Sequence, residues 1–365
     1  MNALSLFSGC GGDTKGMEDA DINVSHYVEY IKNFQKSHLL NFPNSILLTN
    51  DGDITKISDN IYETLKDNIQ IIFGAPPCQS FSTAGKRKED DPRNTMFIYF
   101  HKSVSIIQPE IIIGENVKGL LTKKTASKEL YIDIIQREFE KIHYTIQYKV
   151  IQCHKYGIPQ KRERLFIIGI RNDILELNKY NFSFPQPTNE NNDLMNIITY
   201  SMEKSIKIKK SEFDFNTIPN ECIIKNLDDT TEEQNPHPYI ILKVREPVSK
   251  RTYQGITYNQ ILSFGKRVSP IHLEIIDIRN PCKTIICTYN HQPRLFVPIQ
   301  NKNGYYLRML TIEELLQIQG FPKDYKLFGN DKDKITQIGN SIPPKIVEKI
   351  CNHLFNKTSR ITPTA

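Results

Sequence analysis

The sequence lacks the features that mark secreted and membrane-spanning proteins. Its seven cysteines form no CxxC pair and no dense cluster, so they do not have the pattern of a disulfide framework. The first residues lack a basic segment, and no uninterrupted apolar run is long enough to cross a bilayer. These absences predict reduced thiols, a cytoplasmic location and no membrane partner.

Internal repeats, low-complexity tracts and a strong charge bias are also missing. The net charge of +6 is mildly favourable for a polyanionic partner, but many proteins without such partners are equally basic. The 365 residues are 39% hydrophobic and 24% charged, which is ordinary globular composition. A chain of this length can bury the cores of one large and one smaller domain.

Apolar runs alternate with helix-like stretches in the first half of the chain. The runs span residues 4–7, 24–30, 46–49, 69–73 and 111–114, and the helical patterns span 62–66, 94–107 and 128–141. Two further runs, 146–152 and 165–170, extend the predicted sheet. This alternation predicts an α/β fold with a doubly wound, mostly parallel sheet.

The composition changes after Arg171, where Asn, Pro, Thr and Lys accumulate and helical periodicity is hard to find. We expect a second, smaller domain there that is irregular and partly β. Its stretch 243–267 holds six Lys or Arg against one acid, with Tyr253, Tyr258 and Phe264 between them. Interleaved cations and aromatics suit phosphates and bases, although a solvated loop is the plainer alternative.

Helical signals return near the C-terminus. Thr311 is a predicted N-cap, and Glu314 stands three residues later, as in a capping box. Pro343 and Pro344 precede an amphipathic stretch, 345–355, where a proline in the first turn is tolerated. These signals predict helices over 311–319 and 345–355.

One cysteine has the position of a nucleophile. Cys78 follows the apolar run 69–73 in the sequence Gly74-Ala75-Pro76-Pro77-Cys78-Gln79, a stiff loop where open α/β sheets place their chemistry. The sequence Gly114-Glu115-Asn116 ends another apolar run, at the same sheet edge if the winding is regular. A thiolate and a carboxyl group in one cleft suit attack on a pyrimidine that needs a hydrogen bond at a ring nitrogen. An inert buried thiol is the alternative.

A second group of residues suits an adenosine ligand. The loop from Phe7 to Thr14 is rich in glycine, but Thr14 stands where a dinucleotide fingerprint has its third glycine. Glu29 lies at a strand end 17 residues after Gly12 and suits ribose hydroxyls, and Asp53 suits an adenine amine. The set predicts a nucleoside without phosphates, although each acid alone is compatible with a turn or an N-cap.

A basic segment opens the last predicted strand. Gln160, Arg162 and Arg164 share one face by strand alternation. The guanidinium groups of Arg162 and Arg164 could bind phosphate, or could hold Glu115 and a substrate oxygen. Surface arginines are the alternative interpretation.

These motifs together resemble the DNA (cytosine-5) methyltransferases of bacterial restriction-modification systems. The likeness covers about 1–171 and 280–352. The motifs occur in the family's order: Phe7 to Gly12, Glu29, Asp53, Pro77-Cys78-Gln79, Glu115-Asn116-Val117, Gln160 to Arg164, Arg308 to Thr311 with Gln319 to Pro322, and Gln337 to Pro344.

The resemblance implies a Rossmann-like methyltransferase that uses S-adenosyl-L-methionine. Residues 1–171, completed by 335–358, would form the catalytic domain, and 172–334 the target-recognition domain. The enzyme would methylate C5 of a cytosine flipped out of a short double-stranded DNA sequence, through a covalent bond between Cys78 and C6. A cognate restriction endonuclease acting on the same sequence is the implied further partner, and a monomer is the expected state.

The resemblance also assigns residues. The implied catalytic set is Cys78, Glu115, Arg164, Pro77, Arg162 and Asn116, and the implied cofactor set is Phe7, Gly9, Gly11, Glu29, Asp53, Ile54, Met96, Asn340 and Ser341. The loop 82–93 would close over the flipped base. The expected DNA contacts are Ser82, Lys86, Arg87, Arg93, Lys250, Arg251, Tyr253, Tyr258, Lys266 and Arg267.

Four other functions are weighed against this one. The tRNA-methylating branch of the superfamily typically carries a Cys-Phe-Thr signature, whereas Cys222 and Cys282 are followed by Ile223 and Lys283. A catalytically idle DNA-binding regulator is disfavoured by the intact catalytic set, and a nicotinamide oxidoreductase by Thr14. A zinc protein is disfavoured because the cysteines and histidines lack paired short spacing, so no metal is predicted.

Overall fold

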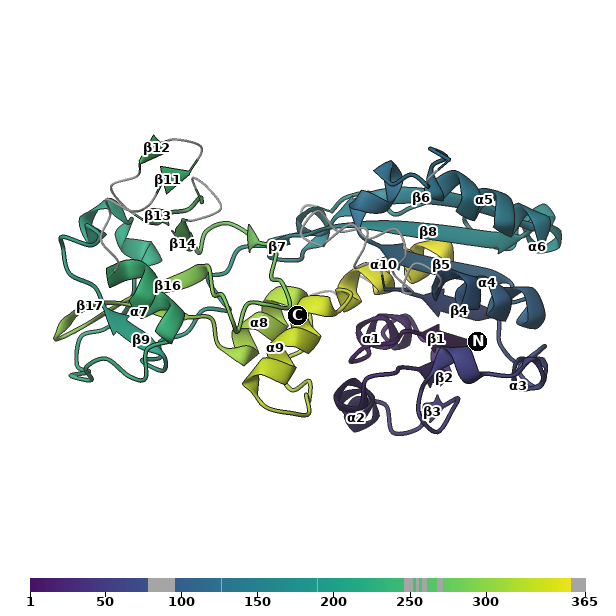
Figure 1. The fold of residues 1–365 in the computed structure, drawn as a ribbon, viewed down its shortest axis with the longest axis horizontal. Helices are drawn as coiled ribbons and strands as arrows, with labels where there is room; N and C mark the ends of the chain where they lie inside the picture. Colours follow the sequence, from purple (N-terminus) through teal and green to yellow (C-terminus); the bar gives the residue numbers. More distant parts are fainter. Residues whose placement is uncertain are drawn as a thin grey trace, which may run out of the picture.

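The chain folds into two parts, each built around its own β-sheet (Figure 1). The computed structural model describes residues 1–77, 96–125, 127–188, 190–245, 252–253, 256–257, 261–267 and 272–355. Helices α8 (Ile312–Gln319) and α9 (Asp331–Asn340) lie between the two parts. Within the described ranges, no helix is long and apolar enough to span a membrane.

The larger part contains a seven-stranded sheet with the order β3-β2-β1-β4-β5-β8-β6. The first five strands in this order are parallel, and β8 runs antiparallel to both of its neighbours. The prediction of a doubly wound, mostly parallel sheet is confirmed. The bounds are β1 Asn2–Leu6, β2 Asn23–Val28, β3 Ile46–Leu47, β4 Ile71–Gly74, β5 Ile111–Asn116, β6 Tyr144–Gln152 and β8 Glu163–Arg171.

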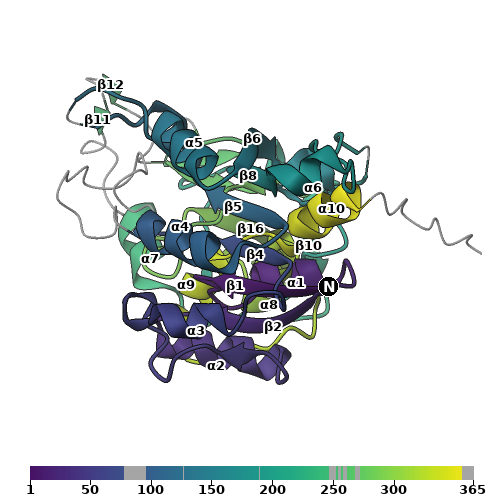
Figure 2. The ribbon, with the colours of Figure 1, turned by 90° about the vertical axis from the view of Figure 1, so that its right-hand side faces the viewer.

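Helices cover both faces of this sheet (Figure 2). The central strand β4 is buried at every position, as its continuous apolar run requires. One face carries α3 (Asp59–Glu63), α4 (Met96–Ile107) and α5 (Tyr131–Lys141), and the other carries α1 (Gly12–Glu18), α6 (Asn172–Glu176) and α10 (Pro344–Leu354); α2 (Lys32–Asn41) lies beside β2 and β3.

The two ends of the chain meet in this part. Helix α10 packs on α1, where a Cβ atom at Gly16 would lie 2.3 Å from the carbonyl oxygen of Pro344. Only glycine permits so close an approach between the two backbones. The first and last segments of the chain therefore share one core, which also includes Ala3 and Ile346.

The smaller part contains a six-stranded sheet. Its order is β13-β14-β16-β17-β9, with β10 paired to β16. The expectation of a partly β second unit is confirmed, and α7 (Pro238–Arg245) adds a helix to it. The bounds are β9 Ser205–Lys207, β10 Ile224–Asn226, β13 Leu262–Phe264, β14 Leu273–Ile275, β16 Leu295–Asn301 and β17 Gly304–Met309; β11 Thr252–Tyr253 pairs with β12 Ile256–Thr257, and β15 Cys282–Lys283 with β7 Gln160–Lys161.

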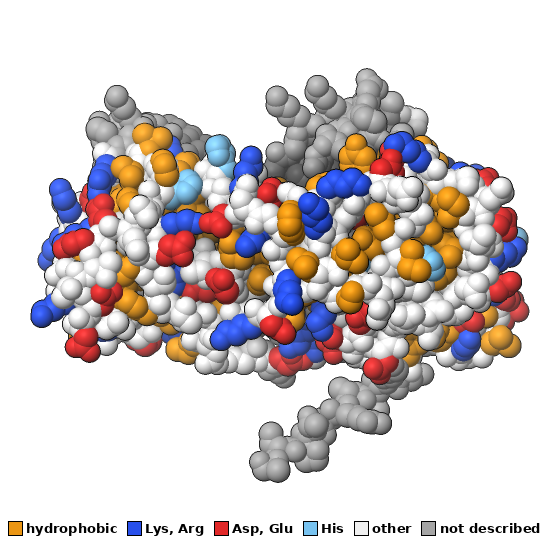
Figure 3. Space-filling view, turned by 90° about the horizontal axis from the view of Figure 1, so that it is seen from below, with side chains coloured by type: hydrophobic (Ala, Val, Ile, Leu, Met, Phe, Trp, Pro, Cys, Tyr) orange, Lys and Arg blue, Asp and Glu red, His pale blue; other side chains and the backbone are white. Residues whose placement is uncertain are grey.

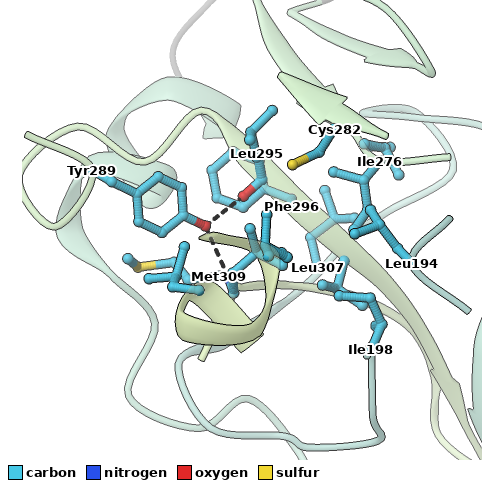
Figure 4. Packing of buried hydrophobic residues seen from close by; sticks show 14 of the residues in the cluster. Leu194, Ile198, Ile276, Cys282, Tyr289, Leu295, Phe296, Leu307 and Met309 are labelled. Carbon is cyan, nitrogen blue, oxygen red and sulfur yellow. Dashed lines mark hydrogen bonds between the residues drawn. The ribbon is translucent and has the colours of Figure 1, made fainter. Parts of the chain in front are cut away.

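A buried tyrosine ties this core together (Figure 4). The hydroxyl of Tyr289 donates to the Leu295 carbonyl oxygen at 2.8 Å and accepts from the Leu310 amide at 2.9 Å. Apolar side chains such as Phe296 and Leu307 pack around it. The hydroxyl thus satisfies two backbone groups that would otherwise be buried without partners.

The predicted capping box at the start of α8 is present, and it includes a buried ion pair. The Thr311 side chain accepts from the Glu314 amide, and the Glu314 carboxylate accepts from the Thr311 amide at 2.9 Å. Both Glu314 oxygens also bind the Arg308 guanidinium, at 2.7 and 2.8 Å, and neither side chain is exposed by more than 2%. This bidentate pair joins β17 to α8.

The contribution of this ion pair to the stability of the fold can be tested by substitution. Replacing Glu314 with Gln leaves the Arg308 charge buried without a counter-charge, which costs about 3–5 kcal/mol. Urea unfolding should show that loss in the free energy of unfolding. The matched control is Glu313→Gln on the exposed side of the same helix turn, which should change stability by less than about 0.5 kcal/mol. Equal effects of the two changes would contradict the assigned role of the pair.

Candidate active site and cofactor cavity

A cavity of about 790 Å³ opens at the carboxyl ends of the parallel strands. This is the usual ligand position in an open α/β sheet, and the size suits a ligand of nucleoside dimensions. Many of the predicted residues line it: Phe7, Gly9, Glu29, Asp53, Ile54, Met96, Pro77, Glu115, Arg164, Asn340 and Ser341. Segments far apart in the sequence are thus brought to one space.

The first loop meets the C-terminal segment at one wall of this cavity. A Cβ atom at Gly12 would lie 2.3 Å from the carbonyl oxygen of Ile342, so this position requires glycine. Gly11, the N-cap of α1 with φ of +91°, is not among the lining residues. The structure therefore places Gly11 beside the predicted cofactor site and Gly9 in it.

Two carboxylates follow the strands at one side of the cavity. Glu29 is buried, and its two oxygens accept from the Gly9 amide at 2.8 Å and the Ile31 amide at 2.7 Å. Burial raises its pKa above the ordinary value, against the effect of these hydrogen bonds. One carboxylate oxygen of Asp53 accepts from Thr55 and so caps a short 3₁₀ helix. Asp53 is therefore an N-cap residue and a residue of the cavity lining at the same time.

Glu115 and Arg164 form an ion pair at the other side. Arg164 Nε lies 2.9 Å from Glu115 Oε1, and both side chains are mostly buried. Burial raises the pKa of Glu115, while the positive charges of Arg164 and Arg162 oppose that rise. Because Gly74 pairs with Gly114 in neighbouring parallel strands, Pro77 and Glu115 lie at the same sheet edge, as predicted. Cys78, which follows Pro77, lies outside the described residues.

Arg162 takes a different position from the predicted one. Its guanidinium is buried and donates to the carbonyl oxygens of Ile285, Gly339 and Ser341, at 3.0–3.2 Å. It therefore does not line the cavity, which corrects the expectation that it could bind phosphate or hold Glu115. The physical reason is a break between β7 and β8 at residue 162, which ends simple strand alternation.

The Asn116 side chain also forms hydrogen bonds with the backbone. Its amide nitrogen donates to the Pro76 carbonyl oxygen at 3.3 Å, and its side-chain oxygen accepts from the Val117 amide at 2.9 Å. The side chain is buried and is not among those lining the cavity. Asn116 thus fixes the chain just before Pro77.

The cavity has an acidic lining. Four carboxyl groups contribute to it, from Asp13, Glu29, Asp53 and Glu115. The one basic side chain among the described lining residues is Arg164, which is already paired with Glu115. An anionic phosphate is disfavoured in such a space, whereas a cationic ligand is favoured.

Sequence reasoning missed five polar residues of this lining, namely Ser8, Asp13, Tyr30, Thr55 and Gln337. Asp13 is hydrogen bonded to the Ser5 hydroxyl, and burial raises its pKa to about 7. Gln337 belongs to the segment Gln337 to Pro344, which is one of the family motifs. Its position in the same motif as Asn340, a predicted cofactor residue, was the signal that could have identified it. Ser8 and Asp13 lie inside the glycine-rich loop, from which only Phe7, Gly9 and Gly11 were assigned to the cofactor.

The predicted DNA contacts are mostly beyond what the structure describes. Ser82, Lys86, Arg87, Arg93, Lys250, Arg251 and Tyr258 lie outside the described residues, and the Tyr253 side chain is likewise not described. Lys266 is exposed and Arg267 is half-buried. On the face in Figure 3, basic, acidic and apolar side chains are interspersed, without a large area of one sign.

Comparisons with known proteins agree on one family. The family model for C-5 cytosine-specific DNA methylases matches residues 1–356. The type II methyltransferase M.FnuDI of Fusobacterium nucleatum is 31% identical over 94% of this chain and 91% of its own length. M.DdeI of Desulfomicrobium norvegicum is 26% identical over 97% and 88%.

Solved structures show the same fold. The Entamoeba histolytica methyltransferase EhMeth superposes with a TM-score of 0.65 at 16% identity, and Dnmt2 of S. pombe with 0.63 at 15%, each over 98% of both chains. With the family model spanning nearly the whole sequence and the cavity in the expected place, this chain belongs to the C-5 cytosine-specific DNA methylases.

Proposed function

We propose that this DNA cytosine-5 methyltransferase uses S-adenosyl-L-methionine, bound in the acidic cavity, and a thiolate at Cys78. The observation that carries the proposal is the buried pair of Glu115 and Arg164, at the sheet edge where the loop to Cys78 begins. The reaction is DNA methylation at C5 of cytosine, as in restriction-modification systems.

The nucleophile is needed because C5 of cytosine is a poor nucleophile in an aromatic ring. Addition of the Cys78 thiolate to C6 breaks the aromaticity and makes C5 reactive. After methylation of C5, loss of the C5 proton and release of Cys78 restore the ring. The target base must leave the duplex stack to reach the site, at a cost of a few kcal/mol that contacts in the pocket offset.

Glu115 supports this addition at the opposite edge of the ring. A carboxyl group with a raised pKa retains its proton more readily, so it can donate to N3 of cytosine as negative charge develops there. The exocyclic amine then donates to its second oxygen. Arg164 holds the carboxyl group in place and limits the rise of its pKa.

The cavity suits the proposed cofactor. S-Adenosyl-L-methionine supplies an electrophilic methyl group, and it carries a sulfonium and an ammonium charge that match the acidic lining. In this proposal Glu29 accepts from the ribose hydroxyls and Asp53 from the adenine amine. Met96, Asn340 and Ser341 line the remaining walls.

The proposal also assigns the two domains, the oligomeric state, the location and the partners of the protein. Residues 1–171 with 335–358 would form the catalytic domain, and 172–334 would read the DNA sequence in the major groove. We infer a monomer that acts on double-stranded DNA in the cytoplasm and protects it from a cognate endonuclease. The type II methyltransferases among the relatives favour DNA over tRNA as the substrate.

The nucleophile can be tested by bisulfite sequencing of plasmid DNA from a methylation-deficient host that expresses the protein. The wild type should leave conversion-resistant cytosines confined to one short motif, and Cys78→Ala should leave none. Cys287→Ala, at a half-buried thiol that does not line the cavity, is the control and should retain the pattern. Full conversion with a soluble, cofactor-binding wild type would contradict DNA as the substrate and direct the search to RNA.

The ionisation of Glu115 can be tested by the pH profile of kcat/KM. If the protonated carboxyl group is the active form, the rate falls as the pH rises through its pKa. Arg164→Met removes a positive neighbour that lowers this pKa, so the alkaline limb should move to higher pH, with a lower maximum. Arg164→Lys keeps the charge and should leave the limb near its wild-type position. An unchanged limb in both variants would contradict the pairing.

The ribose contact can be tested by calorimetry. Glu29→Gln weakens charge-assisted hydrogen bonds, so the Kd for S-adenosyl-L-homocysteine should rise by about 10-fold to 100-fold. Because the contact is to the nucleoside, the Kd for 5′-methylthioadenosine should rise in the same proportion. Glu63→Gln on exposed α3 serves as the control. A change confined to one of the two ligands would disprove this placement of the adenosine.

A further inference from the structure

The segment that follows the strand of Glu115 carries positive charge only. Residues 118–128 contain no acid and four lysines, namely Lys118, Lys123, Lys124 and Lys128. The segment begins directly after β5 and Val117, and both Glu115 and Val117 line the cavity. It continues through a short 3₁₀ helix, Lys118–Thr122, whose Leu120 is buried. The four charges therefore extend from the edge of the candidate site.

Two of these lysines are used within the protein. Lys118 Nζ lies 3.1 Å from a carboxylate oxygen of Glu163. Lys123 Nζ lies over the Tyr131 ring, 5.3 Å from its centre. Both side chains thus have partners that fix them to the larger part of the chain.

The other two lysines face solvent. Lys124 and Lys128 are exposed, and neither forms an ion pair with any residue that the structure describes. The acid next to them in the sequence, Glu129, is already paired with Arg137. Two positive charges are therefore available to a partner outside the protein.

Hydrogen bonds hold the backbone of this loop in one shape. Lys124 and Leu130 form an antiparallel bridge. The Thr125 amide donates to the Glu129 carbonyl oxygen, and the Lys128 amide donates to the Thr125 carbonyl oxygen, both at 2.9 Å. Lys128 has a φ of +67°, a conformation that favours glycine. Its charge thus stands at a position where the backbone itself favours a residue without a side chain.

A second basic segment lies on the same side of the molecule. The loop leads into α5, and α5 and the pair of β11 and β12 lie toward one side in both ribbon views (Figures 1 and 2). That pair belongs to the stretch 243–267, which holds six Lys or Arg against one acid. Each part of the chain therefore contributes basic residues to this side.

The distance from Glu115 suits the flank of a bound duplex. A 3₁₀ helix rises about 2 Å per residue, so the five residues of Lys118–Thr122 carry the chain about 10 Å beyond the end of β5. Successive phosphates of one DNA strand lie about 3.4 Å apart along the axis. With the length of a lysine side chain added, Lys124 can reach phosphates about three to six nucleotides from a base held at Glu115.

An exposed ammonium group without an acidic partner suits a phosphate oxygen. Resting on the proposed function, we propose that Lys124 and Lys128 bind phosphates of the DNA backbone on one flank of the target base. The loop 123–130 is then a DNA-binding element separate from the segments in which the sequence predicts DNA contacts. Contacts of this kind position the duplex and carry no sequence information.

The salt dependence of binding tests this proposal. Fluorescence anisotropy would measure the Kd for a duplex of about 30 base pairs, roughly 100 Å long. Each phosphate contact contributes about −0.9 to the slope of log K against log salt concentration. Lys124→Gln should make the slope less negative by about 0.9 and raise the Kd about 3-fold to 8-fold near 0.1 M salt. A duplex without the methylation motif should show the same change.

Two further variants separate this contact from general effects. Lys66→Gln removes the same charge at an exposed position before β4, at the opposite edge of the sheet, and should leave the slope unchanged. Lys128→Gly should reduce the slope as Lys124→Gln does. Because the φ of Lys128 favours glycine, the melting temperature of Lys128→Gly should stay the same or rise. Weaker binding without lower stability would show that the lost charge, and not a collapsed loop, is the cause.

The opposite results are distinct. A wild type that binds the duplex no better than an RNA hairpin of the same length would overturn the proposed function together with this inference. A wild type that prefers the duplex, with unchanged slopes in both loop variants, would overturn this inference alone. An equal change of slope in Lys66→Gln would also overturn it, because that result would indicate an effect of net charge.

Discussion

The cavity depends on one buried guanidinium group, that of Arg162. It donates to three backbone carbonyl oxygens, one from Ile285 and two from the C-terminal segment at Gly339 and Ser341. That segment forms a wall of the cavity, and the first loop closes against it at Gly12. Without this charge the three carbonyl groups would be buried with fewer partners, and the C-terminal wall would lose one of its attachments to the end of the sheet. A positive charge that never lines the cavity thus holds it together.

The site concentrates groups that destabilise a folded protein. Burial raises the pKa values of Asp13, Glu29 and Glu115, so each carboxylate costs free energy at neutral pH. The unpartnered oxygens of Ser8 and Gln337 add to that cost. The sulfonium and ammonium groups of the proposed cofactor would offset these costs, which would account for the gathering of these groups in one cavity. The seven-stranded sheet, whose strand ends border the cavity, fixes the strands from which these groups extend.

Much of the larger part could be predicted from the sequence because its signals are local. Short apolar runs marked the strands, Thr311 and Glu314 marked a helix start, and Glu29 and Glu115 followed strands whose parallel order brings them to one edge. Arg162 could not be placed because alternation assumes an unbroken strand, and the chain breaks there between β7 and β8. The sheet of the smaller part was also beyond prediction, since β13 and β14 are only three residues long each and carry little local pattern. The lack of a hydrogen-bond partner for the Gln337 side-chain oxygen depends on contacts between distant segments, which no local sequence pattern shows.

The central claim is that Cys78 bonds covalently to the cytosine that becomes methylated. Mass spectrometry of the protein incubated with S-adenosyl-L-methionine and its DNA sequence containing 5-fluorocytosine tests it directly, because fluorine at C5 cannot leave as a proton does and the adduct persists. We predict a stable complex whose mass includes the protein, the DNA and one transferred methyl group, with the peptide containing Cys78 as the site of attachment. A complex attached through another residue, or no complex with DNA that the enzyme methylates when it carries ordinary cytosine, would contradict the account.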